Sequence, residues 1–156
     1  MWASDASTSD EPMQESDDQV DLRDVDAGTA GGYTDEHAAS GTDAELPKID
    51  VFPNQYRGYE IAIVNPEYTS ICPKTGLPDF GTITLRYEPD SSCIELKSLK
   101  LYFLAYRNLG IFHENAVNRM LRDFVGACDP VKMEVNGEFT PRGGLRTTVT
   151  AKYERG

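Results

Sequence analysis

Hydrophobic and polar positions divide the chain into two parts near residue 46. In residues 1–46 the apolar side chains are scattered without a period, so this segment cannot bury enough apolar surface to offset the entropy lost on ordering. We predict that it is a disordered acidic extension. Residues 47–156 instead show regular apolar patterns separated by stretches with Pro and Gly, and they are predicted to form one domain.

The patterned region predicts two strands, two helices and two further strands. The expected strands lie at 59–64, 83–87, 131–135 and 145–151, and the expected helices at 94–107 and 113–128. The strand segments are rich in β-forming residues or alternate between apolar and polar positions, whereas the second helix repeats apolar residues at i and i+4. The first helix segment could also form a strand, but its apolar spacing favours a helix. This order indicates an α+β fold, with an antiparallel sheet and two helices on one face.

Turn-forming residues separate these elements. The stretch 71–82 contains two Pro and two Gly and is predicted to be a loop, as is 141–144. Asn136-Gly137 is predicted to be a turn that follows the third strand.

Charge is distributed as unevenly as hydrophobicity. The formal net charge is -11, but residues 1–46 hold thirteen acidic residues and one arginine, whereas residues 47–156 are close to neutral. An acid-rich folded surface, as in salt-adapted proteins, is therefore not predicted. The simplest interpretation is a solvated acidic tail, and an acidic docking tail is the alternative.

Cysteine usage and the lack of long apolar runs bear on the compartment. Cys72, Cys93 and Cys128 are odd in number and show no zinc-binding spacing, so neither a disulfide framework nor a metal site is predicted. The chain does not start with a secretory signal pattern, and no apolar run approaches the ~20 residues of a membrane span. We expect a reduced, cytoplasmic protein without membrane association.

Cys72 is the strongest candidate nucleophile. It lies in the predicted loop 71–82 beside Lys74, whose charge would stabilise a thiolate. Asp79 follows seven residues later and would come within proton-transfer reach if the loop folds back. A buried structural cysteine with a turn-capping aspartate is the alternative, and the residues alone favour it. The other two cysteines are expected to be small packing residues.

Three cations could bind a phosphate-bearing ligand. Lys97 and Lys100 lie three residues apart on one predicted helix face, and Arg142 lies in the loop 141–144. A solvated basic face is the alternative. Neither a Rossmann nor a Walker glycine pattern is present, so a nucleotide would have to be bound by cationic side chains.

The start of the second predicted helix carries a candidate base-binding group. Glu114 could accept two hydrogen bonds from the amidine edge of a purine-like ring, with His113 beside it and Phe112 stacked on the ring. A first-turn acid favoured by the helix dipole is the alternative for Glu114.

Four ordered motifs resemble those of the NADPH-dependent 7-cyano-7-deazaguanine reductases, enzymes of tRNA queuosine biosynthesis. The motifs are ICPKTGLPDFGTI (71–83), ELKSLKLY (95–102), FHEN (112–115) and PRGG (141–144). The second motif fits the family signature at every position, and the first contains its cysteine and aspartate at the expected spacing. The resemblance covers residues 47–156, in the short, single-module form of the family.

The resemblance implies a tunnelling fold, which is shared with GTP cyclohydrolase I. In this fold antiparallel strands pair across subunits into a barrel, and the active sites lie at subunit interfaces. The short family members are similar to face-to-face pairs of pentamers, so a homo-oligomer, a decamer of two pentamers, is expected.

The resemblance also implies the chemistry and the residues that perform it. Cys72 would add to the nitrile of 7-cyano-7-deazaguanine to give a covalent thioimide, with Asp79 as proton donor. Two NADPH molecules would then reduce it to 7-aminomethyl-7-deazaguanine, a free base, so neither a metal nor direct contact with nucleic acid is implied. The implied substrate-binding residues are Ile94, Glu95, Leu96, Phe112, His113 and Glu114. The implied cofactor-binding residues are Lys97, Lys100 and Arg142.

Three rival functions would show other features. An amidinotransferase-type relative that acts on the same nitrile in archaeal tRNA would lack the lysine-bearing signature, which is complete here. GTP cyclohydrolase I would require zinc ligands of the Cys/His type. A binding module that kept the fold but lost the activity would form no thioimide when substrate is added.

Overall fold

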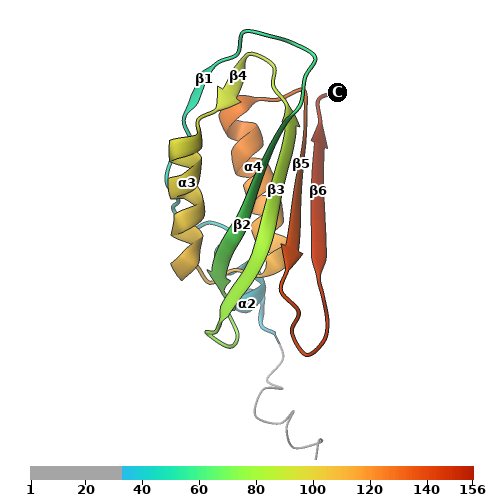
Figure 1. Ribbon diagram of the computed structural model, residues 1–156. Helices are drawn as coiled ribbons and strands as arrows, with labels where there is room; N and C mark the ends of the chain where they lie inside the picture. The colour runs from blue at the N-terminus through green and yellow to red at the C-terminus, as the bar shows by residue number, and fades with distance from the viewer. Residues whose placement is uncertain (1–32) are drawn as a thin grey trace, which may run out of the picture. The chain divides into compact units, whose positions relative to one another are not determined.

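Four antiparallel strands form the main sheet, in the order β2-β3-β5-β6 (Figure 1). The computed structural model describes residues 33–156, so the disorder predicted for residues 1–32 lies outside the described residues. The sheet consists of β2 (Ile61–Ile71), β3 (Pro78–Glu88), β5 (Lys132–Phe139) and β6 (Thr148–Glu154). The other elements are α2 (Asp35–Ala39), β1 (Val51–Pro53), β4 (Ser92–Ile94), α3 (Leu96–Ala105), η1 (Tyr106–Asn108) and α4 (His113–Cys128). The predicted α+β class is confirmed.

Helices α3 and α4 cover one face of the sheet (Figure 1). Helix α4 packs against β5 and β6, and η1 packs against β2. Val117, Met120 and Phe124 of α4 are fully buried in the core that this packing creates. Burying each such side chain contributes about 1.5–3 kcal/mol relative to leaving it in water. None of the helices within residues 33–156 is long and apolar enough to cross a lipid bilayer.

The turn between β2 and β3 is shorter than the sequence predicted. Only residues 72–77 leave the ladder, because β3 already begins at Pro78. A hydrogen bond of 2.9 Å from the Cys72 N–H to the Leu77 carbonyl closes the turn. Asp79 therefore lies in a strand, and its position is set by the sheet instead of by a loop.

The predicted turn at Asn136-Gly137 is wrong, because both residues lie inside β5 and pair with strands on both sides. A Cβ atom at Gly137 would lie 2.8 Å from Val117 Cγ2 on α4 and 2.8 Å from the ring of Phe139. The glycine is needed because the helix and an aromatic ring approach the strand closely there.

Residues 33–46, which the sequence assigned to the disordered extension, are ordered in the structure, and we call them the amino-terminal strap. Arg119 of α4 donates hydrogen bonds to the carbonyls of Gly41, at 2.5 Å, and Ala44. The ordered domain therefore includes the strap and does not begin at Pro47. The hydrophobic pattern failed here because side-chain donors that bind backbone carbonyls hold the strap, and this leaves no apolar period in its sequence.

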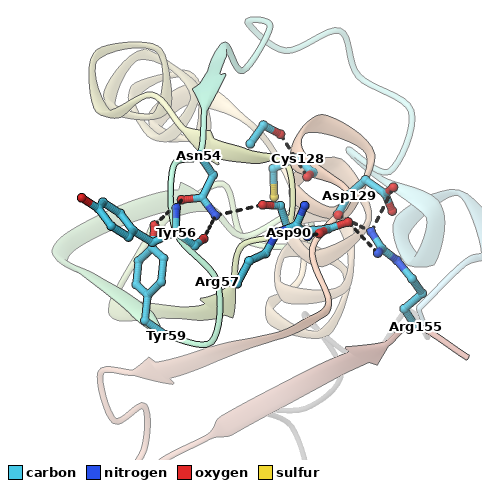
Figure 2. Close-up of polar contacts among 9 residues, drawn as sticks. Asn54, Tyr56, Arg57, Tyr59, Asp90, Cys128, Asp129 and Arg155 are labelled. Atoms are coloured by element: carbon cyan, nitrogen blue, oxygen red, sulfur yellow. Dashed lines mark hydrogen bonds and ion pairs between the residues drawn. The ribbon is translucent and has the colours of Figure 1, made fainter.

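A polar cluster that we call the carboxy-terminal hub lies at the end of the sheet opposite the β2–β3 turn (Figures 1 and 2). It consists of Asn54, Arg57, Asp90, Asp129 and Arg155. The Asn54 amide donates to the Asp90 carbonyl at 2.8 Å, and Arg57 forms an ion pair with the Asp90 carboxylate. Arg155 pairs with Asp90 at 2.8 Å and with Asp129 at 3.0 Å. The hub thus joins the β1–β2 loop, the β3–β4 turn, the end of α4 and the last residues of the chain.

Candidate active site

Three segments meet at the end of the sheet that carries the β2–β3 turn: that turn, the first turn of α4, and the β5–β6 connection (Figure 1). They bring Cys72, Asp79, His113 and Arg142 together. These residues are far apart in the sequence, and the antiparallel order of the strands places them at one edge of the domain.

Cys72 has the surroundings of an ionisable thiol. Only 5% of its surface is exposed, and burial by itself raises the pKa of a thiol. The Thr75 hydroxyl and the backbone N–H groups of Thr75 and Lys74 donate hydrogen bonds to the sulfur, as does the Arg142 guanidinium. These donors outweigh burial and lower the pKa of Cys72 to about 7. About half of the thiol would then be ionised at neutral pH.

Asp79 is the buried acid of the cluster, with 4% of its surface exposed. The Arg142 guanidinium forms an ion pair with one carboxylate oxygen and also donates to the Pro78 carbonyl at 3.4 Å. On the other side, His113 Nε2 lies 3.4 Å from the second carboxylate oxygen. A buried carboxylate requires such partners. Arg142, for which a cofactor phosphate is the expected ligand, lies against the candidate acid and nucleophile.

The His113 ring is stacked flat on Phe139 of β5, with ring centroids 3.8 Å apart and planes at 1°. Burial lowers the pKa of His113, and the charge of Glu114 opposes this only in part, so the imidazole is neutral at neutral pH. Among residues 33–156 its buried Nε2 has no hydrogen-bond partner, since the contact with Asp79 lacks hydrogen-bond geometry. An unpaired polar atom beside a buried acid is suited to bind a ligand.

The start of α4 presents three different groups on consecutive residues. Phe112 precedes the helix in an extended conformation, and its ring packs edge-on against Tyr33 of the strap, with centroids 5.2 Å apart. Glu114 is exposed in the first turn, where the helix dipole stabilises its charge. An aromatic ring, a neutral imidazole and an exposed carboxylate therefore follow one another at this end of the sheet.

Two contributors to the site were not predicted from the sequence. Thr75 has a recognisable signal, because its hydroxyl also accepts from the Leu77 N–H at 3.2 Å, a local bond typical of threonine in turns. Phe139 has no such signal, since nothing in its sequence neighbourhood distinguishes it from other strand aromatics.

Comparison with known proteins identifies the family. The model of the family described as QueF-like protein matches residues 78–156. The NADPH-dependent 7-cyano-7-deazaguanine reductase of Elusimicrobium minutum is 59% identical over 125 residues, which are 80% of this chain and 95% of that protein. The chain belongs to the QueF-like protein family. The Elusimicrobium match is longer than the 110 residues of 47–156, so the similarity of this QueF-like chain to its relative extends into residues before Pro47.

Two further comparisons extend this result. The reductase of the same name from Chlorobaculum tepidum is 62% identical over 109 residues, which are 69% of the QueF-like chain and 93% of that protein. The crystal structure of the archaeosine synthase QueF-Like in the apo form matches with a TM-score of 0.56 at 20% identity. That match covers 60% of this chain and 91% of the other, and it concerns the fold alone.

Five predicted ligand-binding residues of the QueF-like chain lie away from Cys72. They are Ile94, Glu95, Leu96, Lys97 and Lys100, on β4 and the first turns of α3. This region begins at the end of the sheet opposite the β2–β3 turn (Figure 1).

The first three of these residues have different surroundings. The Glu95 carboxylate caps α3 by accepting from the backbone N–H groups of Ser98, at 2.7 Å, and Lys97, at 2.8 Å, and these bonds lower the pKa of Glu95. Leu96 is 60% exposed, but Ile94 is 2% exposed and belongs to the core. The side chain of Ile94 therefore packs inside the domain.

Proposed function

We propose that this chain is an NADPH-dependent reductase that converts the nitrile of 7-cyano-7-deazaguanine to the aminomethyl group of 7-aminomethyl-7-deazaguanine. The observation that carries the proposal is that Arg142 contacts both the Cys72 sulfur and the buried Asp79 carboxylate, while the donors around the sulfur lower the pKa of Cys72 to about 7. The name of the 59% identical relative supports the choice of substrate and cofactor. The proposed substrate is a free base in the cytoplasm, so direct contact with tRNA is not part of the proposal.

Cys72 and Asp79 would perform the covalent step. The thiolate adds to the nitrile carbon, and Asp79 delivers to the nitrile nitrogen the proton that the thiol lost. The addition therefore gives a thioimide and needs no other reagent. Arg142 would stabilise the thiolate and hold the carboxylate in place, and covalent attachment would retain the base through both reductions.

The amino-terminal turn of α4 would bind the base. Glu114 would accept hydrogen bonds from the amidine edge, and the unpaired Nε2 of His113 would face the substrate near Asp79. Phe112 would contact the ring. A neutral imidazole in this position can accept or donate a hydrogen bond without adding charge to the buried acid.

The surface of α3 fits a phosphate-bearing cofactor. Lys97 is exposed near the helix start, and Lys100 and Arg107 border a groove of 290 Å³ between α3 and β2. Apolar side chains that include Leu99 and Phe103 line the groove. Ammonium and guanidinium groups beside an apolar surface suit the phosphates and flat rings of a dinucleotide. When bound, NADPH supplies the hydride for each of two reductions.

We infer that two subunits complete each site, because the start of α3, which carries Glu95 and Lys97, lies toward the other end of the domain from the β2–β3 turn, which carries Cys72 (Figure 1). Strands β2 and β6 form the edges of the four-stranded sheet, and edge strands pair readily with a second copy. Pairing of this kind would close the sheets into a barrel, and we propose the decamer of two pentamers on this basis.

Substrate-adduct formation tests the proposed chemistry. Purified protein mixed with 7-cyano-7-deazaguanine without NADPH should gain the mass of the base on the peptide that contains Cys72. With NADPH present, two cofactors should be oxidised per nitrile consumed. Cys93→Ala and Cys128→Ala serve as matched controls and should retain adduct and turnover. An adduct on either of these cysteines, or none at all, would disprove the assignment.

Subunit mixing tests the shared site. Cys72→Ala and the double variant Lys97→Ala/Lys100→Ala should each be nearly inactive. If a site takes its thiol from one subunit and its lysines from the next, an equal mixture that is dissociated and reassembled should regain about a quarter of wild-type activity. A mixture that stays inactive although it reassembles would show that each site is built within one subunit.

A further inference from the structure

The amino-terminal strap is fixed along the start of α4, next to the candidate site. Asn115 of α4 donates to the Ala38 carbonyl at 2.6 Å, and the Ser40 hydroxyl donates to the Gly110 carbonyl at 2.8 Å. These bonds add to those that Arg119 makes with the strap carbonyls. Several hydrogen bonds from one element give the strap a defined path.

Contacts continue from the strap to the nucleophile. Gly41 has a φ of 76° and packs so closely that a Cβ atom there would lie 2.6 Å from the Gly110 carbonyl oxygen. Ile111, which follows Gly110 in the chain, donates its N–H to the Ile71 carbonyl at 3.0 Å. Ile71 directly precedes Cys72, so the strap supports the backbone that positions the thiol.

Tyr33, at the beginning of the strap, lies between two residues of the site. Its ring meets Phe112 in an edge arrangement, with centroids 5.2 Å apart and planes at 66°. The Lys74 ammonium lies 4.6 Å from the centroid of the same ring. Edge-to-face aromatic pairs and cation–π contacts are both attractive. Tyr33 is 65% exposed, so its ring is not part of the hydrophobic core.

We propose that the amino-terminal strap is part of the active site and that Tyr33 is a positioning residue. Its ring holds Phe112, which would contact the substrate base, and Lys74, which belongs to the turn around Cys72. The identity of that substrate rests on the proposed function. Because the Lys74 backbone is one of the donors to the Cys72 sulfur, Tyr33 also steadies the turn that surrounds the nucleophile.

Full-length Tyr33→Ala and Tyr33→Phe proteins test this role, because phenylalanine keeps the ring and both of its contacts. Tyr33→Ala should raise the KM for 7-cyano-7-deazaguanine about tenfold, with a smaller change in kcat. Tyr33→Phe should match the wild type. The unfolding temperature should stay close to that of the wild type in both variants, since the residue is exposed.

A measurement without substrate separates this inference from the proposed function. The rate at which iodoacetamide alkylates Cys72, followed by mass spectrometry over a pH series, should have its midpoint near 7 in the wild type. The midpoint should move to higher pH in Tyr33→Ala but not in Tyr33→Phe. If the wild type shows this profile but reduces no nitrile, the proposed function fails, and the midpoint shift still supports the positioning role.

Two results would overturn the inference. One is a Tyr33→Ala protein with the KM and the alkylation profile of the wild type. The other is a large fall in its unfolding temperature with an unchanged alkylation midpoint, which would assign the ring to folding alone.

Discussion

The two ends of the sheet each carry a polar cluster that contains an ion pair between aspartate and arginine, but the two clusters have opposite character. At the β2–β3 turn, Cys72 has its pKa lowered to about 7, and the buried Nε2 of His113 has no hydrogen-bond partner among residues 33–156. At the carboxy-terminal hub, Asp90 is paired with Arg57 and Arg155 (Figure 2). One cluster leaves groups ready for a ligand, whereas the other uses its charges to hold the chain together.

Two of the three buried cysteines, Cys72 and Cys128, show why exposure alone does not reveal a reactive thiol. Cys72 is 5% exposed and Cys128 is 1% exposed. Burial raises the pKa of Cys128 to about 12, and the neighbouring Cys93 and Asp129 add to the effect. At Cys72 burial acts in the same direction, but four hydrogen-bond donors outweigh it. The donors around the sulfur, and not its distance from solvent, decide which thiol ionises.

Removing one carboxylate from each cluster should give the largest difference between the two ends, with a loss of activity at one and a loss of stability at the other. Asp79→Asn should lower kcat by about 10²- to 10⁴-fold, because an amide cannot transfer the proton to the nitrile nitrogen. Asp90→Asn should leave kcat near the wild-type value and lower the unfolding temperature, because two arginines lose a charged partner. Steady-state kinetics and thermal unfolding of both variants check this. The opposite pattern would reverse the roles assigned to the two ends.

Two truncations test how far the active end of the domain extends. Removing residues 1–32 should leave kcat/KM unchanged, because the contacts described for the strap begin at Tyr33. Removing residues 1–46 should lower kcat/KM about tenfold or more, since small displacements of a reacting group are costly. It should also reduce stability, because the mostly buried Arg119 would lose two carbonyl acceptors. Equal activity of the two proteins would show that the strap does not support the site.

The strap also marks the limit of what the sequence predicted. Strong periodicity predicted helix α4 and the existence of the four strands of the main sheet, because apolar residues that face one core must recur with the period of their element. The predicted bounds were too short for β2 and β3, and the short strands β1 and β4 were not predicted. The strap is held by donors from α4 to backbone carbonyls, and such bonds leave no pattern in the strap's own residues. The turn predicted at Gly137 was wrong for a related reason, because a contact distant in the sequence requires the glycine. Helix α4 approaches the strand so closely there that a side chain would not fit.

The candidate site could be predicted only in part. Cys72 and Asp79 share one motif, so their spacing in the sequence was informative, but their pairing with His113 and Arg142 depends on three segments that meet in space. The sequence placed Arg142 with the cofactor because a loop arginine is a common phosphate ligand. Its ion pair with Asp79 required the β5–β6 connection to fold over β3, which no local pattern indicates.

Replacing Arg142 sharpens the contrast between the cysteines. Arg142→Met removes one donor to the sulfur, so the pKa of Cys72 should rise above about 7. Adduct formation should then slow several-fold at pH 6–7 and recover above pH 8.5, where the thiol ionises in any case. Arg142→Lys should restore part of the loss at low pH. A pH profile identical to that of the wild type would show that the other donors suffice.

The smallest effect is expected at the hub. Arg155 pairs with Asp90 and Asp129 and donates to the Asp129 carbonyl at 2.5 Å, but it is itself 36% exposed, so solvent screens these interactions. Arg155→Ala should lower the unfolding temperature by a few degrees at most, with kcat unchanged. Lys152→Ala, which breaks a single exposed pair with Glu134, is the matched control and should have less effect. A fall in kcat at constant stability in Arg155→Ala would mean that this end of the sheet also acts in catalysis. That result would be expected if the hub orients Glu95 and Lys97 toward the Cys72 of a neighbouring subunit.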